Sequence, residues 1–231
     1  MKHRLFLFDL DDTLLDFKAS EQLSFSRTLQ ALGIEGPIDK LFAHYQRVNL
    51  ALWRQFESGR VSKDFLKVER FRHTFATHAL ELDPALASQQ YLDTLAECVV
   101  LVDGAQAVCE TLAGLGEVGI ITNGIEHVQH RRIQAAGLTC HVAFVATSEA
   151  CGHAKPDTRF FDYTVRKART GFDKGATLIV GDRLDADILG ANRFGIDSCW
   201  FNPGGMANET EARPTYEIAG LGELVPLLQA A

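Results

Sequence analysis

Short apolar runs, each bounded by polar residues, recur along the chain and predict buried parallel strands. The first covers residues 5–8, where four apolar residues stand between charged ones. Unbroken apolar runs of this length are typical of strands that are covered on both faces. We expect five such strands, at residues 5–8, 118–121, 142–146, 176–180 and 198–201.

Helical patterns fill the intervals between the later strands. Gly137 and Gly195 stand where helices stop, and Pro156 stands at a helix start, where its missing N–H costs little. The patterns predict helices at 105–115, 126–136, 156–169 and 184–194. Strands that alternate with helices in this way predict an α/β fold with a Rossmann-like, mostly parallel sheet.

The stretch from residue 17 to residue 99 differs, because it contains no convincing strand. It divides into amphipathic segments at 19–32, 37–57, 62–78 and 84–98, which glycine and proline separate. We therefore expect two domains, an α/β core (1–16 plus 100–231) and an all-helical cap (17–99) inserted after the first strand. Such a cap would cover the carboxyl edge of the sheet, where ligands bind in open α/β folds.

Composition and charge narrow the classes of function. The chain has 231 residues, 46% of them hydrophobic, which is enough for a sizeable core, and its formal net charge is −7. Its longest basic cluster is Arg131-Arg132 beside His130, which we interpret as a solvated helix face. A protein that binds a nucleic-acid polymer would carry a basic stripe, so we expect no such partner.

Cysteine usage and the apolar segments indicate a cytoplasmic protein. The five cysteines are widely spaced, odd in number and without a CxxC pair, which indicates reduced thiols. The apolar run behind the basic N-terminus stops at Asp9, far short of a signal peptide or a membrane span. We expect no membrane partner, and either a monomer or a homodimer. The eight histidines are scattered and predict no zinc site.

Asp9 and Asp11 directly follow the first predicted strand. Side chains two apart on an extended chain point the same way, so both carboxylates can face one site. Neighbouring carboxylates repel, which keeps one of them protonated unless a cation intervenes. The pair suits a nucleophile beside a general acid, with a hard metal ion attached. The alternative is a solvated acidic loop or a helix N-cap.

Two further segments could bind an anion. Thr122-Asn123-Gly124 lies between a predicted strand and a helix, where a hydroxyl, an amide and loop N–H groups can form an anion cradle. Lys155 opens the next predicted helix and can neutralise a phosphoryl group. Taken singly, the first could be a plain turn and the second a surface lysine.

Acidic residues also follow the predicted strand at 176–180. Asp182 stands where a carboxylate could complete an oxygen shell for Mg²⁺, and Asp187 could orient its neighbours from the following helix. The alternatives are an N-cap for Asp182 and an exposed helix acid for Asp187. We interpret Asp185 as solvated.

Together these motifs resemble those of the haloacid dehalogenase (HAD) superfamily. The ordered set is Asp-x-Asp-x-Thr from Asp9, Thr-Asn-Gly from Thr122, Lys155-Pro, and Gly-Asp-x₄-Asp ending at Asp187. The resemblance covers almost the whole chain, because the helical insert resembles the cap which that superfamily places between its first two motifs. It implies a HAD fold and an enzyme of that superfamily.

The resemblance also implies a role for each matching residue. Asp9 would attack phosphorus and become an aspartyl-phosphate, while Asp11 would protonate the leaving oxygen and then assist water. Thr122 would hold a phosphoryl oxygen, with help from the segment of Asn123 and Gly124.

Further roles concern charge. Lys155 would steady both the nucleophile and the transferred phosphoryl group. Mg²⁺ would be held by the Asp9 carboxylate, the Asp11 backbone carbonyl and the Asp182 carboxylate, and Asp187 would support the metal site. Positioning and charge neutralisation are what phosphoryl transfer requires.

Asp11 also separates reaction classes. The superfamily's carbon–halogen hydrolases generally lack this second aspartate and need no metal, so Asp11 and Asp182 favour phosphate chemistry. Sugar-phosphate mutases share the motifs and remain an alternative, as do phosphatases for sugar phosphates or phosphoglycolate. A third hypothesis is a catalytically silent HAD-like binding protein, which would be expected to have lost a catalytic carboxylate or the lysine.

Residues 45–53 and 197–203 further resemble the house-cleaning pyrimidine 5′-nucleotidases, whose substrates are pyrimidine nucleoside monophosphates. Asn49 and Trp53 lie four apart on one face of a predicted helix, so an amide and an indole could bind and stack a base. Alternatively, Trp53 packs in the cap core and Asn49 is a polar helix position. Phe17, at the core–cap junction, could also contact the substrate, which we expect to be a small phosphate ester.

Overall fold

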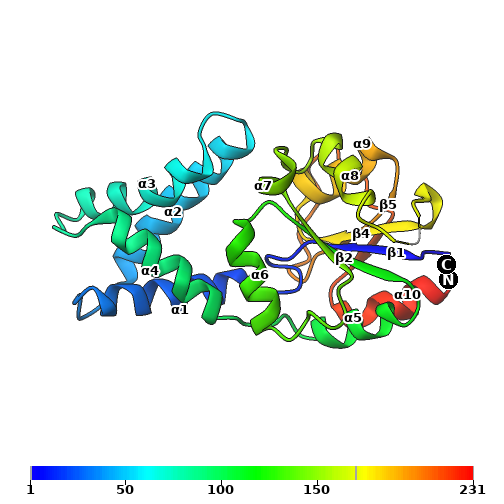
Figure 1. Ribbon diagram of the computed structural model, residues 1–231, viewed down its shortest axis with the longest axis horizontal. Coiled ribbons are helices and arrows are strands. Elements are labelled where there is room, and N and C mark those ends of the chain that lie inside the picture. The colour runs from blue at the N-terminus through cyan, green and yellow to red at the C-terminus, as the bar shows by residue number, and fades with distance from the viewer. Residues whose placement is uncertain (1, 170, 231) are drawn as a thin grey trace. The chain divides into compact units, whose positions relative to one another are not determined.

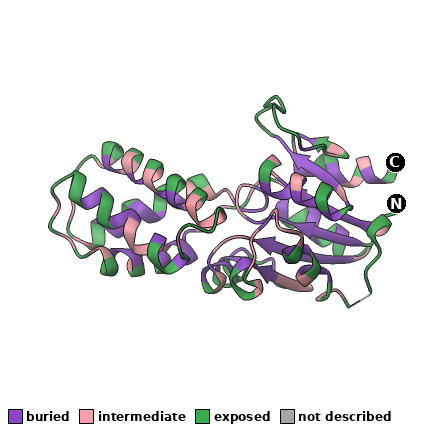
Figure 2. Ribbon diagram, turned by 90° about the horizontal axis from the view of Figure 1, so that it is seen from above, coloured by how far each residue is buried: buried purple, intermediate pink, exposed green. Residues whose placement is uncertain are grey.

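The computed structural model describes residues 2–169 and 171–230. The chain forms two compact units. The first, which we call the sheet unit, consists of the residues up to Phe17 and from Val100 onward. The second, the helical unit, is Lys18–Val99. Each unit has its own buried core, which Figure 2 shows in purple.

Six parallel strands form the sheet of the sheet unit (Figure 1). Their order is β3-β2-β1-β4-β5-β6, so the chain builds outward on one side of β1 and then returns to the other side. The strands are β1 (Leu5–Phe8), β2 (Glu117–Thr122), β3 (Phe144–Thr147), β4 (Thr177–Gly181), β5 (Asp197–Phe201) and β6 (Tyr216–Ile218). The predicted α/β fold with a parallel sheet is confirmed.

The burial of β1 explains its central place. All four of its side chains are buried, as its unbroken apolar run predicts. Leu5 and Leu7 belong to a core cluster with side chains of the following helices, and the alternation of a strand turns Phe6 and Phe8 to the opposite face. By contrast, the edge strand β6 has three residues with one buried side chain, too few for a sequence pattern to reveal.

Helices cover both faces of this sheet (Figure 1). α5 (Ala105–Ala113) and α10 (Leu224–Ala230) lie on one face, and α8 (Thr158–Val165) and α9 (Leu189–Phe194) lie on the other. α6 (Glu126–Ala135) follows β2, and α7 (Ser148–Cys151) follows β3. Short 3₁₀ turns, η1 (Lys174–Ala176) and η3 (Leu221–Glu223), precede β4 and α10.

The helix predicted at 184–194 begins in a different form. Its first part is a π-helix, η2 (Leu184–Ile188), and only the second part, α9, is α-helical. Gly195 ends α9 with a left-handed φ of 82°, a conformation that glycine adopts without steric cost. The predicted helix stop is therefore confirmed, and the π-turn is the feature that the pattern did not reveal.

Four helices form the helical unit, α1 (Phe17–Ala31), α2 (Asp39–Glu57), α3 (Lys63–Thr77) and α4 (Pro84–Glu97). Two of their starts follow from local sequence. The Ser62 side chain accepts a hydrogen bond from the Phe65 N–H, and the Asp83 side chain accepts one from the Ala85 N–H. Such caps satisfy N–H groups that a helix start leaves without partners.

Aromatic rings form the core of the helical unit. The Tyr45 ring lies 4.6, 5.2 and 5.6 Å from the rings of Phe25, Phe71 and Tyr91, measured between centroids. Contacts at these distances add to the gain from burying each ring. The core therefore holds helices α1 to α4 together without any strand.

Three histidines of the helical unit are less scattered than the sequence indicates. His44 Nε2 and His73 Nδ1 are 3.2 Å apart, and the rings of His44 and His78 lie 5.2 Å apart. Packing of α2 against α3 brings them together. Across residues 2–169 and 171–230, no helix combines the length and the apolar composition that a bilayer span requires.

Candidate active site

The register of the sheet brings three sequence motifs to one edge. Phe8 pairs with Ile120 of β2 and with Val180 of β4. Asp9 follows β1, Thr122 ends β2 and Asp182 follows β4, so all three lie at the carboxyl edge of neighbouring strands. The chain reverses its strand order at β1, and such a switch point is where open α/β sheets bind ligands.

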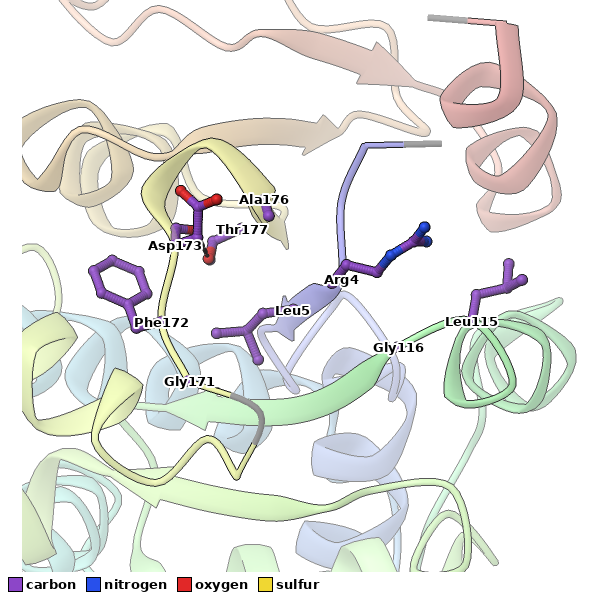
Figure 3. A pocket seen from close by; sticks show the side chains of 9 residues that line it. All are labelled: Arg4, Leu5, Leu115, Gly116, Gly171, Phe172, Asp173, Ala176 and Thr177. Carbon is purple, nitrogen blue, oxygen red and sulfur yellow. Dashed lines mark hydrogen bonds between the residues drawn. The ribbon is translucent and has the colours of Figure 1, made fainter.

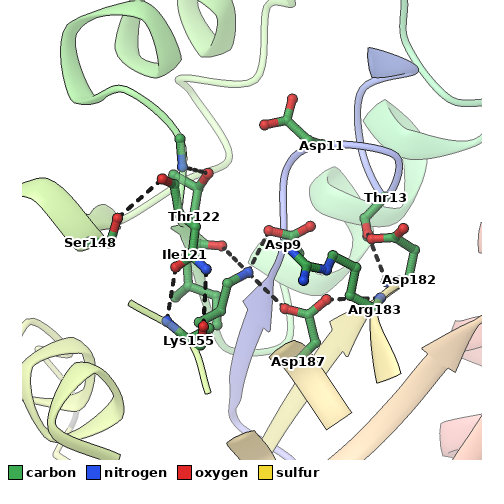
Figure 4. Close-up of polar contacts among 12 residues, drawn as sticks. Asp9, Asp11, Thr13, Ile121, Thr122, Ser148, Lys155, Asp182, Arg183 and Asp187 are labelled. Atoms are coloured by element: carbon green, nitrogen blue, oxygen red, sulfur yellow. Dashed lines mark hydrogen bonds and ion pairs between the residues drawn. The ribbon is translucent and has the colours of Figure 1, made fainter. Parts of the chain in front are cut away.

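A buried lysine joins two of the acids (Figure 4). Lys155 Nζ donates to Oδ1 of Asp9 at 2.5 Å and to Oδ1 of Asp187 at 2.7 Å. Its third hydrogen bond, at 3.1 Å, goes to the backbone oxygen of Ile121. Three donors therefore meet three acceptors, and the ammonium group is fixed in place. Burial disfavours its charge, but the two carboxylates outweigh that effect and raise the pKa of Lys155.

Asp9, Asp182 and Asp187 form a compact acidic group. One carboxylate oxygen from each lies within 4.8 Å of the others, and this is the one such group of potential metal ligands among the described residues. Burial, and then mutual repulsion, raises the pKa of Asp182 to about 8. Burial also raises the pKa of Asp9 to about 7, against the opposing effect of Lys155. The metal-free group therefore holds protons near neutral pH.

The charge of this group fits a divalent cation. Three carboxylates face one ammonium, so the fully ionised group carries two uncompensated negative charges. Within the described part of the chain, no hydrogen bond engages Oδ2 of Asp9, and Asp182 accepts a single long one, 3.4 Å from Thr13 Oγ1. Carboxylate oxygens are the ligands that Mg²⁺ prefers. Asp9 and Asp182 are thus the residues that would hold the ion.

Asp187 has a different environment from the other two acids. It is fully buried, and Lys155 Nζ and the Arg183 N–H donate to its two oxygens at 2.7 and 3.1 Å. Gly181 makes room for it, because a Cβ there would lie 2.3 Å from Asp187 Oδ2. The π-turn η2 presents this side chain inward, whereas Asp185 two residues earlier is exposed and pairs with Arg183.

Neighbouring side chains also hold the Asp182 segment. The indole of Trp200, on β5, donates to the Asp182 backbone oxygen at 2.9 Å. The Asp182 N–H donates to Thr13 Oγ1 at 3.1 Å. Thr13 is the threonine of the first motif, so the loops after β1 and β4 are tied together beside the acidic group.

The hydroxyl of Thr122 has a defined direction. It accepts hydrogen bonds from the Gly124 N–H at 3.0 Å and from Gln129 Nε2 at 2.9 Å. A hydroxyl has two lone pairs and one proton. Because both lone pairs are engaged, the proton is left for an external acceptor such as a phosphoryl oxygen.

Asn123 connects this loop to the lysine. Its Oδ1 accepts from the Lys155 N–H at 2.9 Å, and its Nδ2 donates to the Lys155 backbone oxygen at 3.1 Å. Ser148 Oγ in turn donates to the Asn123 backbone oxygen at 3.1 Å. These reciprocal bonds fix Lys155 relative to β2, so the asparagine of this motif acts on the lysine in this structure.

Asp11 lies apart from the acidic group. Figure 4 shows its carboxylate turned away from the Lys155 ammonium. Arg132 Nη1 donates to its Oδ1, and Gln129 Nε2 donates to its Oδ2 at 2.7 Å. The predicted solvated helix face is therefore wrong for Arg132, which is buried, whereas its neighbour Arg131 is exposed.

Sequence reasoning missed Gln129 and Arg132, although a signal exists. The buried positions of α6 include Val128, Gln129, Arg132 and Ile133. Polar residues therefore stand on the apolar face of an amphipathic helix, where they need partners. The helical period places both residues on the buried face of α6, so considering it beside the charge would have made them candidates for the site.

The remaining predicted substrate residues have contacts of their own. Phe17 is half-buried, and its ring centroid is 5.6 Å from the Arg132 guanidinium carbon. In the helical unit, Asn49 is buried and donates to Glu21 Oε1 at 2.8 Å, while Arg70 donates to its Oδ1 at 3.2 Å. Trp53 is half-buried, and its ring lies 5.7 Å from that of Phe56.

A hollow also exists at the opposite edge of the sheet (Figure 3). It measures about 570 Å³ and lies by the amino ends of β1 and β4, where Arg4, Leu5 and Thr177 line it. Its charged lining residues are Arg4 and Asp173. Its described lining residues include no lysine and no pair of carboxylates, unlike the carboxyl edge of the sheet.

The fold and site together define a class of enzyme. A family model described as haloacid dehalogenase-like hydrolase matches residues 3–195. The matched stretch includes Asp9, Thr122, Lys155 and the acidic residues after β4. The chain belongs to the haloacid dehalogenase-like hydrolases, as its motifs predict.

Individual relatives span nearly the full length of the chain. YfnB of Bacillus subtilis (strain 168), named as a HAD-hydrolase, is 37% identical over 98% of this chain and 96% of its own. The magnesium-bound crystal structure of YfnB has a TM-score of 0.90 and covers 99% of both chains. PynA of Streptococcus pneumoniae (strain ATCC BAA-255 / R6), named pyrimidine 5′-nucleotidase, is 35% identical over 99% of this chain and 96% of its own. YjjG of Escherichia coli (strain K12), of the same name, is 30% identical over 99% of both.

Proposed function

We propose that this protein is a Mg²⁺-dependent phosphomonoester hydrolase that acts through an aspartyl-phosphate on Asp9. The observation that carries the proposal is the environment of Asp9. Its carboxylate is fixed by Lys155 at one oxygen, lies beside Asp182, and belongs to the same strand edge as the Thr122 hydroxyl, whose two lone pairs are already engaged. A phosphoryl group at this edge would meet a nucleophile, a cation and a hydroxyl donor.

In the first half-reaction, an Asp9 carboxylate oxygen forms a bond to phosphorus, and the bond from phosphorus to the ester oxygen breaks. Asp11 gives its proton to that oxygen, so the leaving group departs as an alcohol. Lys155 balances the charge of the transferred group, and Thr122 donates to one of its oxygens. The products of this step are the alcohol, ionised Asp11 and aspartyl-phosphate.

In the second half-reaction, Asp11 takes a proton from water as the water oxygen bonds to phosphorus. The bond between phosphorus and the Asp9 oxygen breaks, which regenerates the Asp9 carboxylate and releases inorganic phosphate. Asp11 thereby regains the proton that it lost. Acid and base roles for one carboxyl group follow from this order of steps.

Mg²⁺, held by Asp9 and Asp182, would offset the repulsion between a dianionic ester and the acidic group. The side chains at the site would hold the phosphoryl oxygens in place. Asp187 would do so indirectly, because it fixes Lys155 and the Arg183 N–H. We propose Asp187 as a support of the metal site rather than as a ligand.

We propose pyrimidine nucleoside monophosphates as the substrate class. This finer proposal is supported by two full-length relatives, PynA and YjjG, each named pyrimidine 5′-nucleotidase. Trp53 is our candidate for stacking on the base, since an indole face suits any pyrimidine ring. Asn49 is also a candidate for the base-binding region, where its side chain is held by buried hydrogen bonds to Glu21 and Arg70. Phe17, beside Arg132, is a further candidate for substrate contact.

Phosphate release across a panel of monophosphates tests both levels of the proposal. The panel contains UMP, dUMP, dTMP, CMP, AMP, GMP, phosphoglycolate, glucose phosphates and p-nitrophenyl phosphate, each with Mg²⁺ and with excess chelator. We expect chelator-sensitive release, highest for the pyrimidine nucleotides, and none from an Asp9→Asn variant. Preference for another ester would overturn the substrate class alone, whereas turnover by Asp9→Asn would overturn the mechanism.

A further inference from the structure

Two side chains of α6 hold the Asp11 carboxylate. Arg132 Nη1 donates to Oδ1, and Gln129 Nε2 donates to Oδ2 at 2.7 Å. The same Gln129 nitrogen lies 2.9 Å from Thr122 Oγ1. An amide group carries two N–H bonds, so one can serve each acceptor. Gln129 therefore bridges the proposed acid/base and the proposed phosphoryl-binding hydroxyl.

The orientation of this bridge is fixed. Arg132 Nη1 also donates to Gln129 Oε1, at 2.9 Å. A guanidinium has no acceptor, so this contact requires the amide oxygen to face Arg132 and the amide nitrogen to face Asp11 and Thr122. Gly124 makes the space, because a Cβ at that position would lie 2.1 Å from Gln129 Nε2.

The arrangement is costly for stability, which points to a role at the site. Arg132 is 1% exposed, and its Nε and Nη2 find no hydrogen-bond partner in residues 2–169 and 171–230. The Asp11 side chain with which it pairs is 30% exposed. Buried donors without partners and buried charges both lower stability. Local violations of this kind are expected where a residue serves the chemistry.

We propose that Arg132 and Gln129 are positioning residues that set the Asp11 carboxylate relative to the phosphoryl-binding hydroxyl of Thr122. The inference rests on the proposed function, in which Asp11 transfers the proton to and from the reacting oxygens. Neither α6 residue needs to touch the substrate. Their effect passes through Asp11, so it concerns those reaction steps that require a proton from Asp11.

Leaving groups separate such a role from a merely structural one. The 5′-oxygen of a nucleotide is a poor leaving group and needs the proton from Asp11, whereas p-nitrophenolate departs readily without one. Loss of the positioning pair should therefore slow the first half-reaction, which kcat/KM reports, far more for the nucleotide than for p-nitrophenyl phosphate. The second half-reaction starts from the same aspartyl-phosphate for both esters, so it does not separate them. A general disturbance of the site would lower kcat/KM for both esters by the same factor.

The test compares kcat and KM for UMP and p-nitrophenyl phosphate, with Mg²⁺, in the unaltered protein and in Arg132→Met and Gln129→Met. Since general acid–base catalysis contributes roughly 10²–10⁴-fold, we expect each variant to lose about tenfold or more in kcat/KM for UMP. For the aryl ester we expect a loss in kcat/KM below about threefold. Gln134→Met, an exposed position on the same helix, is the matched control and should match the unaltered protein.

Arg132→Lys keeps the charge and donors on a single nitrogen, so it should recover part of the lost kcat/KM for UMP, and it remains informative if Arg132→Met does not fold. Equal losses in kcat/KM for the two esters, or no loss in kcat/KM for UMP, would overturn this inference while leaving the proposed function intact. Absence of Mg²⁺-dependent hydrolysis of both esters by the unaltered protein would overturn the proposed function and the inference together.

Discussion

Lys155 and Asp9 form an ion pair at 2.5 Å in which neither side chain is more than 9% exposed. Asp187, fully buried, pairs with the same ammonium at 2.7 Å. Attraction between charges is strong where water is excluded, but each charge alone would be costly there. The lysine is thus a counter-charge for two acids at once, and it holds the Asp9 carboxylate in one position.

Replacement of this lysine should affect both folding and activity. Lys155→Met leaves Asp9 and Asp187 buried without a cation, so we expect the metal-free protein to lose about 3–5 kcal/mol of unfolding free energy. Phosphate release should fall by about 10²-fold or more, because a charge that stabilises the transferred group is gone. Urea unfolding and phosphate release measure the two effects. Lys40→Met, at an exposed position, is the control, and equal behaviour of the two variants would contradict the assigned role.

Stability of the metal-free protein should depend on pH through the acidic group. Burial and repulsion raise the pKa of Asp9 to about 7 and that of Asp182 to about 8. The folded state therefore keeps protons that an unfolded carboxyl, with a pKa near 4, has already released. Stability falls with rising pH wherever the folded state binds more protons. We expect the contribution of this group to the unfolding free energy, and with it the Tm, to fall from about pH 4 to about pH 8.

Two comparisons isolate that contribution. Asp182→Asn removes one of the two groups, so the fall in Tm over this pH range should be smaller in the variant than in the unaltered protein. Mg²⁺ replaces the bound protons, so its stabilising effect should grow as the pH rises. An identical pH dependence in the variant, or Mg²⁺ stabilisation that weakens as the pH rises, would contradict the raised pKa values of Asp9 and Asp182.

Gly181 should tolerate no side chain. Its absent Cβ would lie 2.3 Å from Asp187 Oδ2, so Gly181→Ala forces Asp187 away from Lys155 and the Arg183 N–H. We expect a loss of about 1–3 kcal/mol in unfolding free energy and a drop in Mg²⁺-dependent activity. Gly222→Ala is the matched control, since its Cβ would meet nothing within 4 Å. Comparable urea midpoints for the two variants would argue against this packing constraint.

Trp53→Ala tests the proposal that Trp53 stacks on the base of the substrate. If the indole stacks on the pyrimidine, KM should rise for UMP by about 5-fold or more, since a base–aromatic stack contributes roughly 1–3 kcal/mol. The KM for p-nitrophenyl phosphate should stay nearly constant. A parallel rise for both substrates, or a lowered Tm with unchanged KM, would instead assign Trp53 to the packing of the helical unit.

The strands and the strand-end residues could be predicted because their signals are local. A run such as residues 5–8 has no polar face, which predicts burial on both faces, and Asp9 follows from its place after that run. Asp182 is predictable for the same reason, from its place after β4. Parallel pairing then brings such ends to one edge without further information.

Other features depend on contacts between distant parts of the chain. The bond between Arg132 and Asp11 joins residues 121 positions apart, and no local pattern contains it. The meeting of His44 with His73 likewise depends on how α2 packs on α3. The π-turn η2 differs from an α-helix by one hydrogen-bond step, which the apolar period does not resolve.

The central claim is that Asp9 carries the phosphoryl group during turnover. The most direct measurement is acid quenching of the protein mixed with Mg²⁺ and UMP, followed by peptide mapping by mass spectrometry. We predict one phosphoryl group on the peptide that contains Asp9, formed within the time of one turnover and absent from Asp9→Asn. Turnover without phosphorylation of that peptide, or turnover that persists in Asp9→Asn, would contradict the account.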